Sequence, residues 1–129
     1  MPVSKERPRV TRRGFTYTPR KTKNHEKFIQ ETFRLFYPNW TPSEKKLTVF
    51  LEFIFKPPKN TSKKRLLAML GKPCDNNKDL DNLSKTILDS LNTIAYIDDR
   101  QIVFLTAYKT WGEENKTRVE IKEIEEDTD

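Results

Sequence analysis

The amino-acid sequence predicts a single α+β domain in which a mixed β-sheet carries two main helices packed on one face. Its 129 residues suit one modest hydrophobic core and not two. Stretches with apolar residues at every second position alternate with stretches of helical spacing, in the order strand, helix, strand, long loop, helix, strand, strand. No internal repeat divides the chain, so we interpret residues 1–129 as one domain with a basic arm (1–14) and an acidic, flexible tail (123–129).

The first half of the chain contributes two sheet elements and one helix. The stretch "RPRVTRRGFTYTPRKTK" predicts a basic arm that leads into a short strand. Residues 24–37 predict a helix with Asn24 as its N-cap and Pro38 just after its end, because four apolar side chains share one face: Phe28, Ile29, Phe33 and Phe36. Residues 46–55 are apolar on both faces, which predicts a central strand with five side chains on one face: Leu47, Val49, Leu51, Phe53 and Phe55.

The second half begins with a long connection that holds a short basic helix at residues 62–70. A helix of about four turns follows residue 78, because its apolar residues step by three and four: Leu80, Leu83, Ile87, Leu91 and Ile94. Asp81, Lys85 and Asp89 step by four on a different, wetter face of the same helix. Residues 101–109 and 117–124 predict two further strands.

Composition favours a cytoplasmic protein that binds nucleic acid. The N-terminus has no apolar run, no stretch is long enough to cross a bilayer, and Cys74 has no internal partner for a disulfide. Residues 1–72 carry 18 Lys and Arg against 5 Asp and Glu, whereas residues 73–129 carry 7 against 14. Clustered positive charge suits a polyanion. We therefore expect phosphate contacts from the arm and the long loop, through Arg7, Arg9, Arg12, Arg13, Arg20, Lys21, Lys63, Lys64 and Arg65.

The chemistry open to this chain is that of carboxylates. Three Gly, one His and one Cys exclude a glycine-rich phosphate loop, a dinucleotide fingerprint and zinc sites built from His and Cys, and His25 is interpreted as a surface residue. The acidic residues flank the predicted helix after residue 78, with Asp79 and Asp81 at its start and Asp98 and Asp99 after its end. Carboxylates beside a phosphodiester would repel it unless a cation lies between, and Mg²⁺ is the cation that prefers such ligands.

Structural explanations of the same acids remain open at this stage. Asp79 suits an N-cap, Asp81 and Lys85 suit an i,i+4 ion pair, and Asp98-Asp99 suits a turn. For Asp99 to meet Asp79 and Asp81, residues 92–97 must double back along the helix, or the acids must converge across a dimer interface.

The run from Asp79 to Val103 resembles the RusA-type crossover-junction endodeoxyribonucleases. It combines D-L-D-N-L, a Lys shortly after it, "ILDSLN" and "YIDDRQIV", and "RPRVTRRGFTYTP" is similar to that family's opening. The resemblance implies a homodimer that resolves four-way (Holliday) DNA junctions in recombination and repair, with Mg²⁺ or its substitute Mn²⁺ and no nucleotide cofactor or membrane. It also implies that Asp79, Asp81 and Asp99 bind the metal and that Lys85 assists catalysis. The family's "KPD" lead-in is drawn out here to "KPCDNNKD".

Two alternatives stay open on the residues. One is a nuclease of the PD-(D/E)xK kind that uses Asp75, Glu120 and Lys122, although strand alternation would turn Glu120 and Lys122 away from the core. The other is a basic DNA-binding module without catalysis, in which the acids are only caps and turns.

Overall fold

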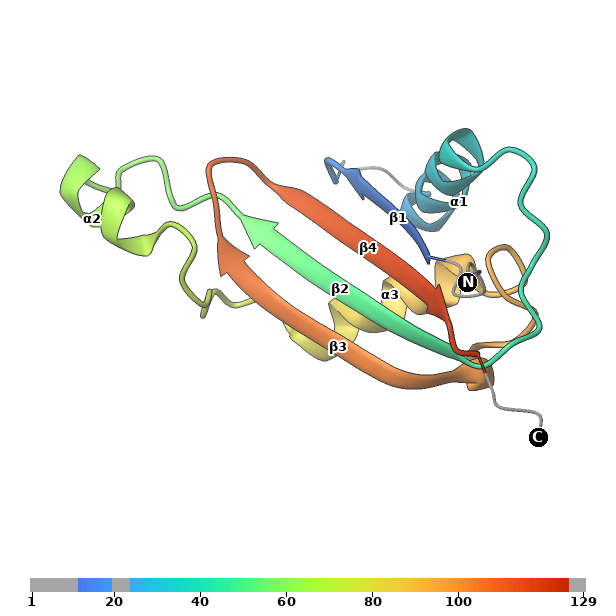
Figure 1. Cartoon of the computed structure of the whole chain (residues 1–129). Coiled ribbons are helices and arrows are strands. Elements are labelled where there is room, and N and C mark those ends of the chain that lie inside the picture. The colour runs from blue at the N-terminus through green and yellow to red at the C-terminus, as the bar shows by residue number, and fades with distance from the viewer. Residues whose placement is uncertain (1–11, 20–23, 126–129) are drawn as a thin grey trace, which may run out of the picture.

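The computed structural model describes residues 12–19 and 24–125, which form one four-stranded sheet with helices on one face (Figure 1). The elements along the chain are β1 (Arg12–Tyr17), α1 (His25–Phe36), β2 (Leu47–Phe55), α2 (Lys63–Met69), α3 (Leu80–Leu91), the 3-10 helix η2 (Asp99–Gln101), β3 (Ile102–Trp111) and β4 (Lys116–Glu123). The order and type of the elements confirm the α+β class.

The sheet is mixed and β2 is one of its two central strands, as its two apolar faces predicted. The strand order is β1-β4-β2-β3, with β3 parallel to β2 and the other neighbours antiparallel. The parallel pair needs a long crossover, and the chain between β2 and β3 supplies it with α2 and α3. β3 is therefore an edge strand.

The core lies between the sheet and the two longer helices. β2 buries Leu47, Val49, Leu51 and Phe53, which cluster with Ile29 and Phe33 of α1 and with Ile87 and Leu91 of α3. Burying each such side chain contributes roughly 1.5–3 kcal/mol. Phe36 is 51% exposed and its ring lies against Phe15, so the apolar face of α1 is narrower than its spacing predicted. Asn24 occupies the N-cap position without a capping hydrogen bond from its side chain.

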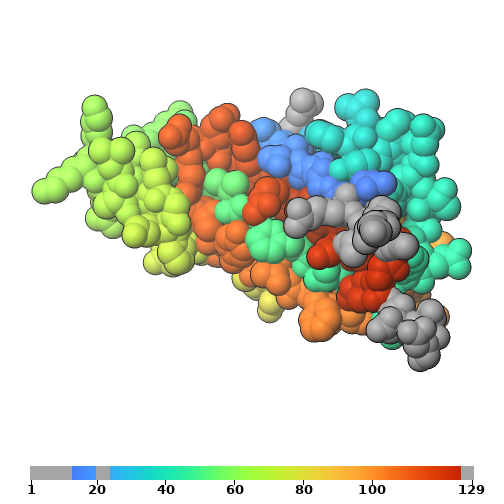
Figure 2. Space-filling view, in the orientation of Figure 1, coloured from blue at the N-terminus to red at the C-terminus, as the bar shows by residue number. Residues whose placement is uncertain are grey.

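The described helices leave the opposite face of the sheet open, and side chains of β4, β2 and β3 form the surface in Figure 2. Phe50 and Tyr108 meet edge to face on it, and the guanidinium of Arg118 lies 4.8 Å from the centre of the Phe50 ring. Arg118 also donates a hydrogen bond to Glu52. These contacts make the open face an ordered surface of mixed polarity.

The long loop after β2 projects α2 beyond the end of the sheet (Figure 1) and then returns along β3. Gly71, with a φ of 81°, allows the chain to turn there, and its N–H donates to the carbonyl of Trp111. The thiol of Cys74 is buried and forms no disulfide with a described residue, and the backbone N–H of Cys74 donates to the carbonyl of Lys109. The loop is thus fixed to the last residues of β3.

The limits of the arm and the tail differ from those predicted. Residues 1–11 and 126–129 lie outside the described chain, whereas residues 12–14 belong to β1. Glu123 ends β4 and accepts a hydrogen bond from Ser43, and Glu125 pairs with Lys45 at 3.2 Å, so residues 123–125 are not a free tail. Of the helices described, none has the length and apolar character needed to span a membrane.

Candidate active site

Helix α3 presents three charged side chains to one cleft. Asp79 caps the helix by accepting a hydrogen bond from the N–H of Asp81 at 3.1 Å, and this cap fixes where the helical spacing begins. Asp81, Lys85 and Asp89 then recur at successive turns, all exposed, and line a cleft of about 460 Å³ between α3 and β3. The wetter face that the spacing predicted is therefore the wall of this cleft.

Asp99 enters the same cleft from η2. Its neighbour Asp98 is the cap of that short helix, because one oxygen of Asp98 accepts the N–H of Arg100 at 3.0 Å. Asp99 is exposed, and no hydrogen bond or ion pair to the described residues engages its carboxylate. The turn explanation thus holds for Asp98, while Asp99 keeps a carboxylate that the fold does not use.

Within the cleft, Asp99 lies toward the Asp89 end. Burial raises the pKa of the Tyr96 hydroxyl, and the negative charges of Asp99 and Asp89 raise it further, so both carboxylates are near that hydroxyl. Tyr96 itself is fully buried and donates to the carbonyl of Leu88 at 2.6 Å. Asp81 is eight residues before Asp89, a rise of about 12 Å along the helix.

The chain between α3 and η2 does not make the extended return that would carry Asp99 back to Asp79. Residues 92–97 form turns at the C-terminal end of α3, and Thr93 takes a φ of 68°. Asp79, at the opposite end of the helix, is not among the residues that line the cleft. In the described chain, no group of three or more His, Cys, Asp or Glu side chains is placed to hold a metal ion.

The donor chemistry of the cleft nevertheless suits Mg²⁺. Asp81, Asp89 and Asp99 offer hard carboxylate oxygens, and Mg²⁺ in proteins commonly takes one or two carboxylates together with waters and substrate phosphates. Lys85 forms no ion pair with Asp81 or Asp89 in the part of the chain that the structure describes, so the i,i+4 ion pair that the spacing suggested is not formed in this structure. Its ammonium is exposed at the cleft and available to an anion.

Two residues that position the site were missed by the sequence reasoning. Gln101 accepts the N–H of Asp98 and donates to the carbonyls of Ser43 and Lys45, each at 2.8 Å, which anchors η2. Lys109 donates to the carbonyl of Lys78 at 2.6 Å, immediately before the Asp79 cap. It also donates to Asn76 in the drawn-out lead-in. The sequence signal for the Lys109 anchor was a Lys on the helix-facing side of an otherwise apolar strand.

The predicted DNA-contacting residues separate into three groups. Arg7, Arg9, Arg20 and Lys21, together with the side chain of Arg12, lie outside the described residues. The guanidinium of Arg13 lies 5.1 Å from the centre of the Trp40 ring and 5.9 Å from that of Tyr37, so it packs on the segment that follows α1. Lys63, Lys64 and Arg65 are exposed on α2. Figure 1 shows α2 beyond the same end of the sheet at which α3 begins.

The structure separates the residues of the alternative PD-(D/E)xK site. Asp75 lines a hollow with Arg65 and Trp111 at the far end of β3. Glu120 pairs in register with Phe50, well down the sheet from that end, because Trp111 pairs with Phe55. Neighbouring Val119 and Ile121 are buried, as alternation predicted, and Lys122 is exposed. These three residues do not form one site.

Comparison with known proteins supports the resemblance that the motif suggested. A family model described as "Endodeoxyribonuclease RusA" matches residues 1–122 of the chain. The protein "Uncharacterized protein YqaN" of Bacillus subtilis (strain 168) is 38% identical over 69 residues, which are 54% of this chain and 45% of that protein. The match thus spans about half the length of this curated relative.

Proposed function

Because the chain belongs to the RusA endodeoxyribonuclease family, we propose that it is a Mg²⁺-dependent enzyme that cuts phosphodiester bonds in four-way (Holliday) DNA junctions. The observation that carries the proposal is that Asp81, Lys85 and Asp99 line one cleft and that no ion pair joins them among the described residues.

In this proposal the carboxylates hold the metal, and Mn²⁺ can replace Mg²⁺. Asp81 and Asp99 face the cleft, and Asp79 retains one carboxylate oxygen after the other has accepted the capping hydrogen bond. A bound Mg²⁺ supplies a more acidic water and stabilises the leaving oxygen. Lys85, one turn after Asp81, places its ammonium beside the same phosphate and offsets the charge that develops on it.

Basic residues hold the DNA without reading its sequence. Lys63, Lys64 and Arg65 are exposed on α2, beyond the end of the sheet at which α3 begins, and the arm adds the remaining Arg and Lys. Contacts of this kind to phosphates position a duplex and carry little base information. A homodimer suits a junction that has two-fold symmetry and needs two opposing cuts.

The decisive experiment incubates the protein with a synthetic four-way junction, with and without Mg²⁺, beside a linear duplex of the same sequence. We expect paired cuts in the junction only when Mg²⁺ is present. Asp81→Asn should lose Mg²⁺ binding and cleavage while junction affinity stays or rises, because a negative charge near the phosphate is removed. Junction binding without cleavage in either Mg²⁺ or Mn²⁺ would instead favour a DNA-binding module.

A further inference from the structure

A second cavity, of about 390 Å³, lies on the helix-covered face of the sheet, between the N-terminal ends of α1 and α3. The end of β2 and the start of β4 complete its walls. It is separate from the cleft that Asp81, Lys85 and Asp99 line, because the two hollows lie on different sides of α3 and share no lining residue. Small-molecule sites in proteins commonly have volumes of about 300–1,000 Å³. The cavity is therefore large enough for one small ligand.

The floor of this cavity is one row of cross-strand neighbours in the sheet. Tyr17, Thr117 and Phe53 form the row, and their side chains are 7%, 4% and 3% exposed. Ile87 of α3 is also buried and lines the cavity from the helix side, and the ring of Phe55 adds to the wall. Aromatic side chains of this kind stack well on flat rings. The interior thus suits a planar, largely apolar group.

A pair of hydroxyls gives the floor one polar point. The side chains of Tyr17 and Thr117 hydrogen-bond to one another. Burial raises the pKa of the Tyr17 hydroxyl to about 12, although the hydrogen bond with Thr117 lowers it, so the group stays neutral at neutral pH. A neutral hydroxyl can both donate and accept a hydrogen bond. The floor can therefore pair with a ring nitrogen or a carbonyl on the edge of a planar ligand.

The mouth of the cavity, where its lining residues are most exposed, is basic. Lys78 is exposed, and His25 and Lys116 are half-buried. The ammonium of Lys116 pairs with Glu114 at 3.7 Å, but none of the described residues that line the cavity is an Asp or Glu. The cleft on the other side of α3 has the opposite character, because carboxylates line it. The mouth of this cavity therefore suits an anionic group.

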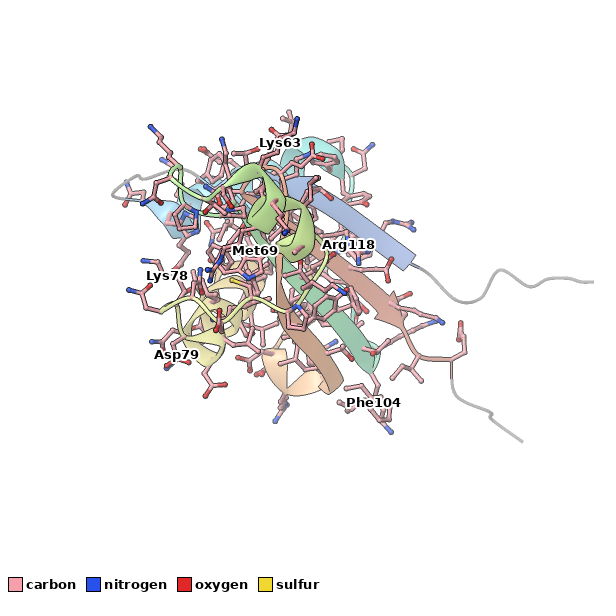
Figure 3. The ribbon with its side chains drawn as sticks, turned by 90° about the vertical axis from the view of Figure 1, so that its left-hand side faces the viewer. Lys63, Met69, Lys78, Asp79, Phe104 and Arg118 are labelled. Atoms are coloured by element: carbon pink, nitrogen blue, oxygen red, sulfur yellow. The ribbon has the colours of Figure 1, made fainter. Side chains whose placement is uncertain are left out.

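The cavity adjoins the acids at the start of α3 through Lys78. Figure 3 looks onto this end of the molecule, where Lys78 and Asp79 follow one another at the start of the helix. Lys109 is the next neighbour of Phe53 in the same row of the sheet, and its ammonium donates to the carbonyl of Lys78 at 2.6 Å. One row of the sheet thus forms the floor of the cavity and also fixes the backbone just before Asp79.

We propose that this cavity binds one unpaired nucleotide, with its base on the aromatic floor and its phosphate at Lys78. The base matches the apolar walls and the hydroxyl pair, and the phosphate matches the basic mouth. A base inside a duplex is paired and stacked, so it must leave the stack before it can enter such a cavity. Leaving costs least where stacking is already interrupted, as at the point where the strands of a junction exchange.

The position of the cavity assigns the nucleotide a place in the substrate, and this step rests on the proposed function. Because Lys78 precedes Asp79, the bound nucleotide lies next to the phosphate that is cut. Its base then decides where along the strand the enzyme cuts. The cavity is in this way the specificity site of the same reaction.

The nucleotide site is tested without metal and without cutting. The probe is a dye-labelled trinucleotide with one base between two abasic sugars, made once for each of the four bases. The matched probe has three abasic sugars and the same charge. In titrations followed by fluorescence anisotropy, at least one base should improve affinity about tenfold or more, as expected for a base stacked on aromatic side chains. Equal affinities for all probes would overturn the inference and leave the cavity to an apolar side chain of a protein partner.

Two matched variants show whether the cavity carries this preference. Thr86→Trp fills the cavity from an exposed position of α3. Thr106→Trp is the control, because Thr106 is an exposed Thr beside Phe50 on the open face of the sheet. With both variants folded by thermal melting, Thr86→Trp should bind all probes as weakly as the abasic one, and Thr106→Trp should keep the preference. A preference that survives in Thr86→Trp, or disappears in both, would overturn the site.

Lys78→Ala tests the phosphate contact without altering the floor. It should weaken the base-containing and abasic probes alike and reduce the salt dependence of binding, because it removes a contact with phosphate. Unchanged affinity for both probes would overturn the placement of the phosphate at Lys78.

Junction substrates test where the nucleotide comes from. Each nucleotide beside the cut is replaced in turn by an abasic sugar. At one position the loss of the base should slow cutting by the parental protein about tenfold or more, and it should slow Thr86→Trp no further. If no position has this effect although the trinucleotide preference is present, the assignment to the substrate strand is overturned, and a free deoxynucleoside monophosphate should then compete with the probe. A parental protein that never cuts a junction would overturn the proposed function, whereas the trinucleotide titration would still decide the nucleotide site.

Discussion

Asp98 and Asp99 are adjacent carboxylates to which the structure gives different tasks. Asp98 caps η2 through Arg100 and is locked to Gln101, whereas Asp99 faces the cleft with no hydrogen bond from the described residues. We predict that Asp98→Ala lowers stability and spares cleavage, and that Asp99→Ala spares stability and abolishes cleavage.

The magnitudes follow from these contacts. Replacing an Asp cap by Ala costs about 1 kcal/mol, and the Asp98 side chain is 49% exposed, which argues against a larger loss. For a domain of this size, that free energy lowers the melting temperature by roughly 4 °C. Asp99→Ala removes no contact and should change the free energy of unfolding by less than about 0.5 kcal/mol. Its cleavage rate should fall at least about 100-fold, equivalent to about 2.7 kcal/mol of barrier.

Both variants are compared with the parental protein by thermal melting and by single-turnover cleavage of the four-way junction, well below all melting temperatures. Junction affinity is measured in parallel without Mg²⁺, so that a loss of binding is not taken for a loss of chemistry. The reasoning is refuted if Asp99→Ala cuts at the parental rate. It is also refuted if Asp98→Ala is as inactive as Asp99→Ala while fully folded.

Three further outcomes are expected. Lys85→Ala should melt as the parental protein does but cut at least about tenfold more slowly, equivalent to about 1.4 kcal/mol of barrier, and Lys85→Arg should restore the rate only in part. The matched control is Lys27→Ala, at an exposed position of α1. Normal cutting by Lys85→Ala would show that Lys85 has only a structural role. Asp79→Asn should keep the helix cap, since Asn caps as well as Asp, yet lose cleavage; a melting temperature well below parental would show that the charge itself stabilises α3. Neutralising the three basic side chains of α2, Lys63, Lys64 and Arg65, should weaken junction binding. The slope of log affinity against log salt concentration should fall in magnitude by up to about 0.9 for each phosphate that the variant no longer binds. An unchanged slope would show that the DNA binds to another surface.

The parts of the site that the sequence predicted depend on local periodicity. The three- and four-residue steps of α3 are set by the helix itself, so the shared face of Asp81, Lys85 and Asp89 was predictable without knowing any neighbour. The central position of β2 followed from the apolar character of both its faces. The Asp79 cap followed from its position before the first apolar step.

The parts that could not be predicted depend on contacts between distant segments. The position of Asp99 is decided by turns in which Thr93 takes a positive φ, which its residue type does not indicate. Gln101 and Lys109 hold the site together through backbone carbonyls more than 30 residues away in sequence. A backbone carbonyl is present at every position, so the sequence gives no sign of which one a side chain will find.

For the proposed metal site, the charges of the cleft would cost little folding stability and yet favour the substrate. Asp81, Asp89 and Asp99 are exposed, so water screens their mutual repulsion. Two unit charges about 12 Å apart, the rise between Asp81 and Asp89, repel by only about 0.3 kcal/mol in water. A DNA phosphate that approaches the same cleft excludes that water, and the repulsion then rises because the local dielectric falls. A divalent cation reverses its sign, since it attracts the carboxylates and the phosphate together. In the proposed function, the same side chains would therefore exclude DNA without metal and bind it with metal, while α2 and the basic arm would retain the duplex in either state. Metal occupancy, and not DNA affinity, would then be the condition for cutting.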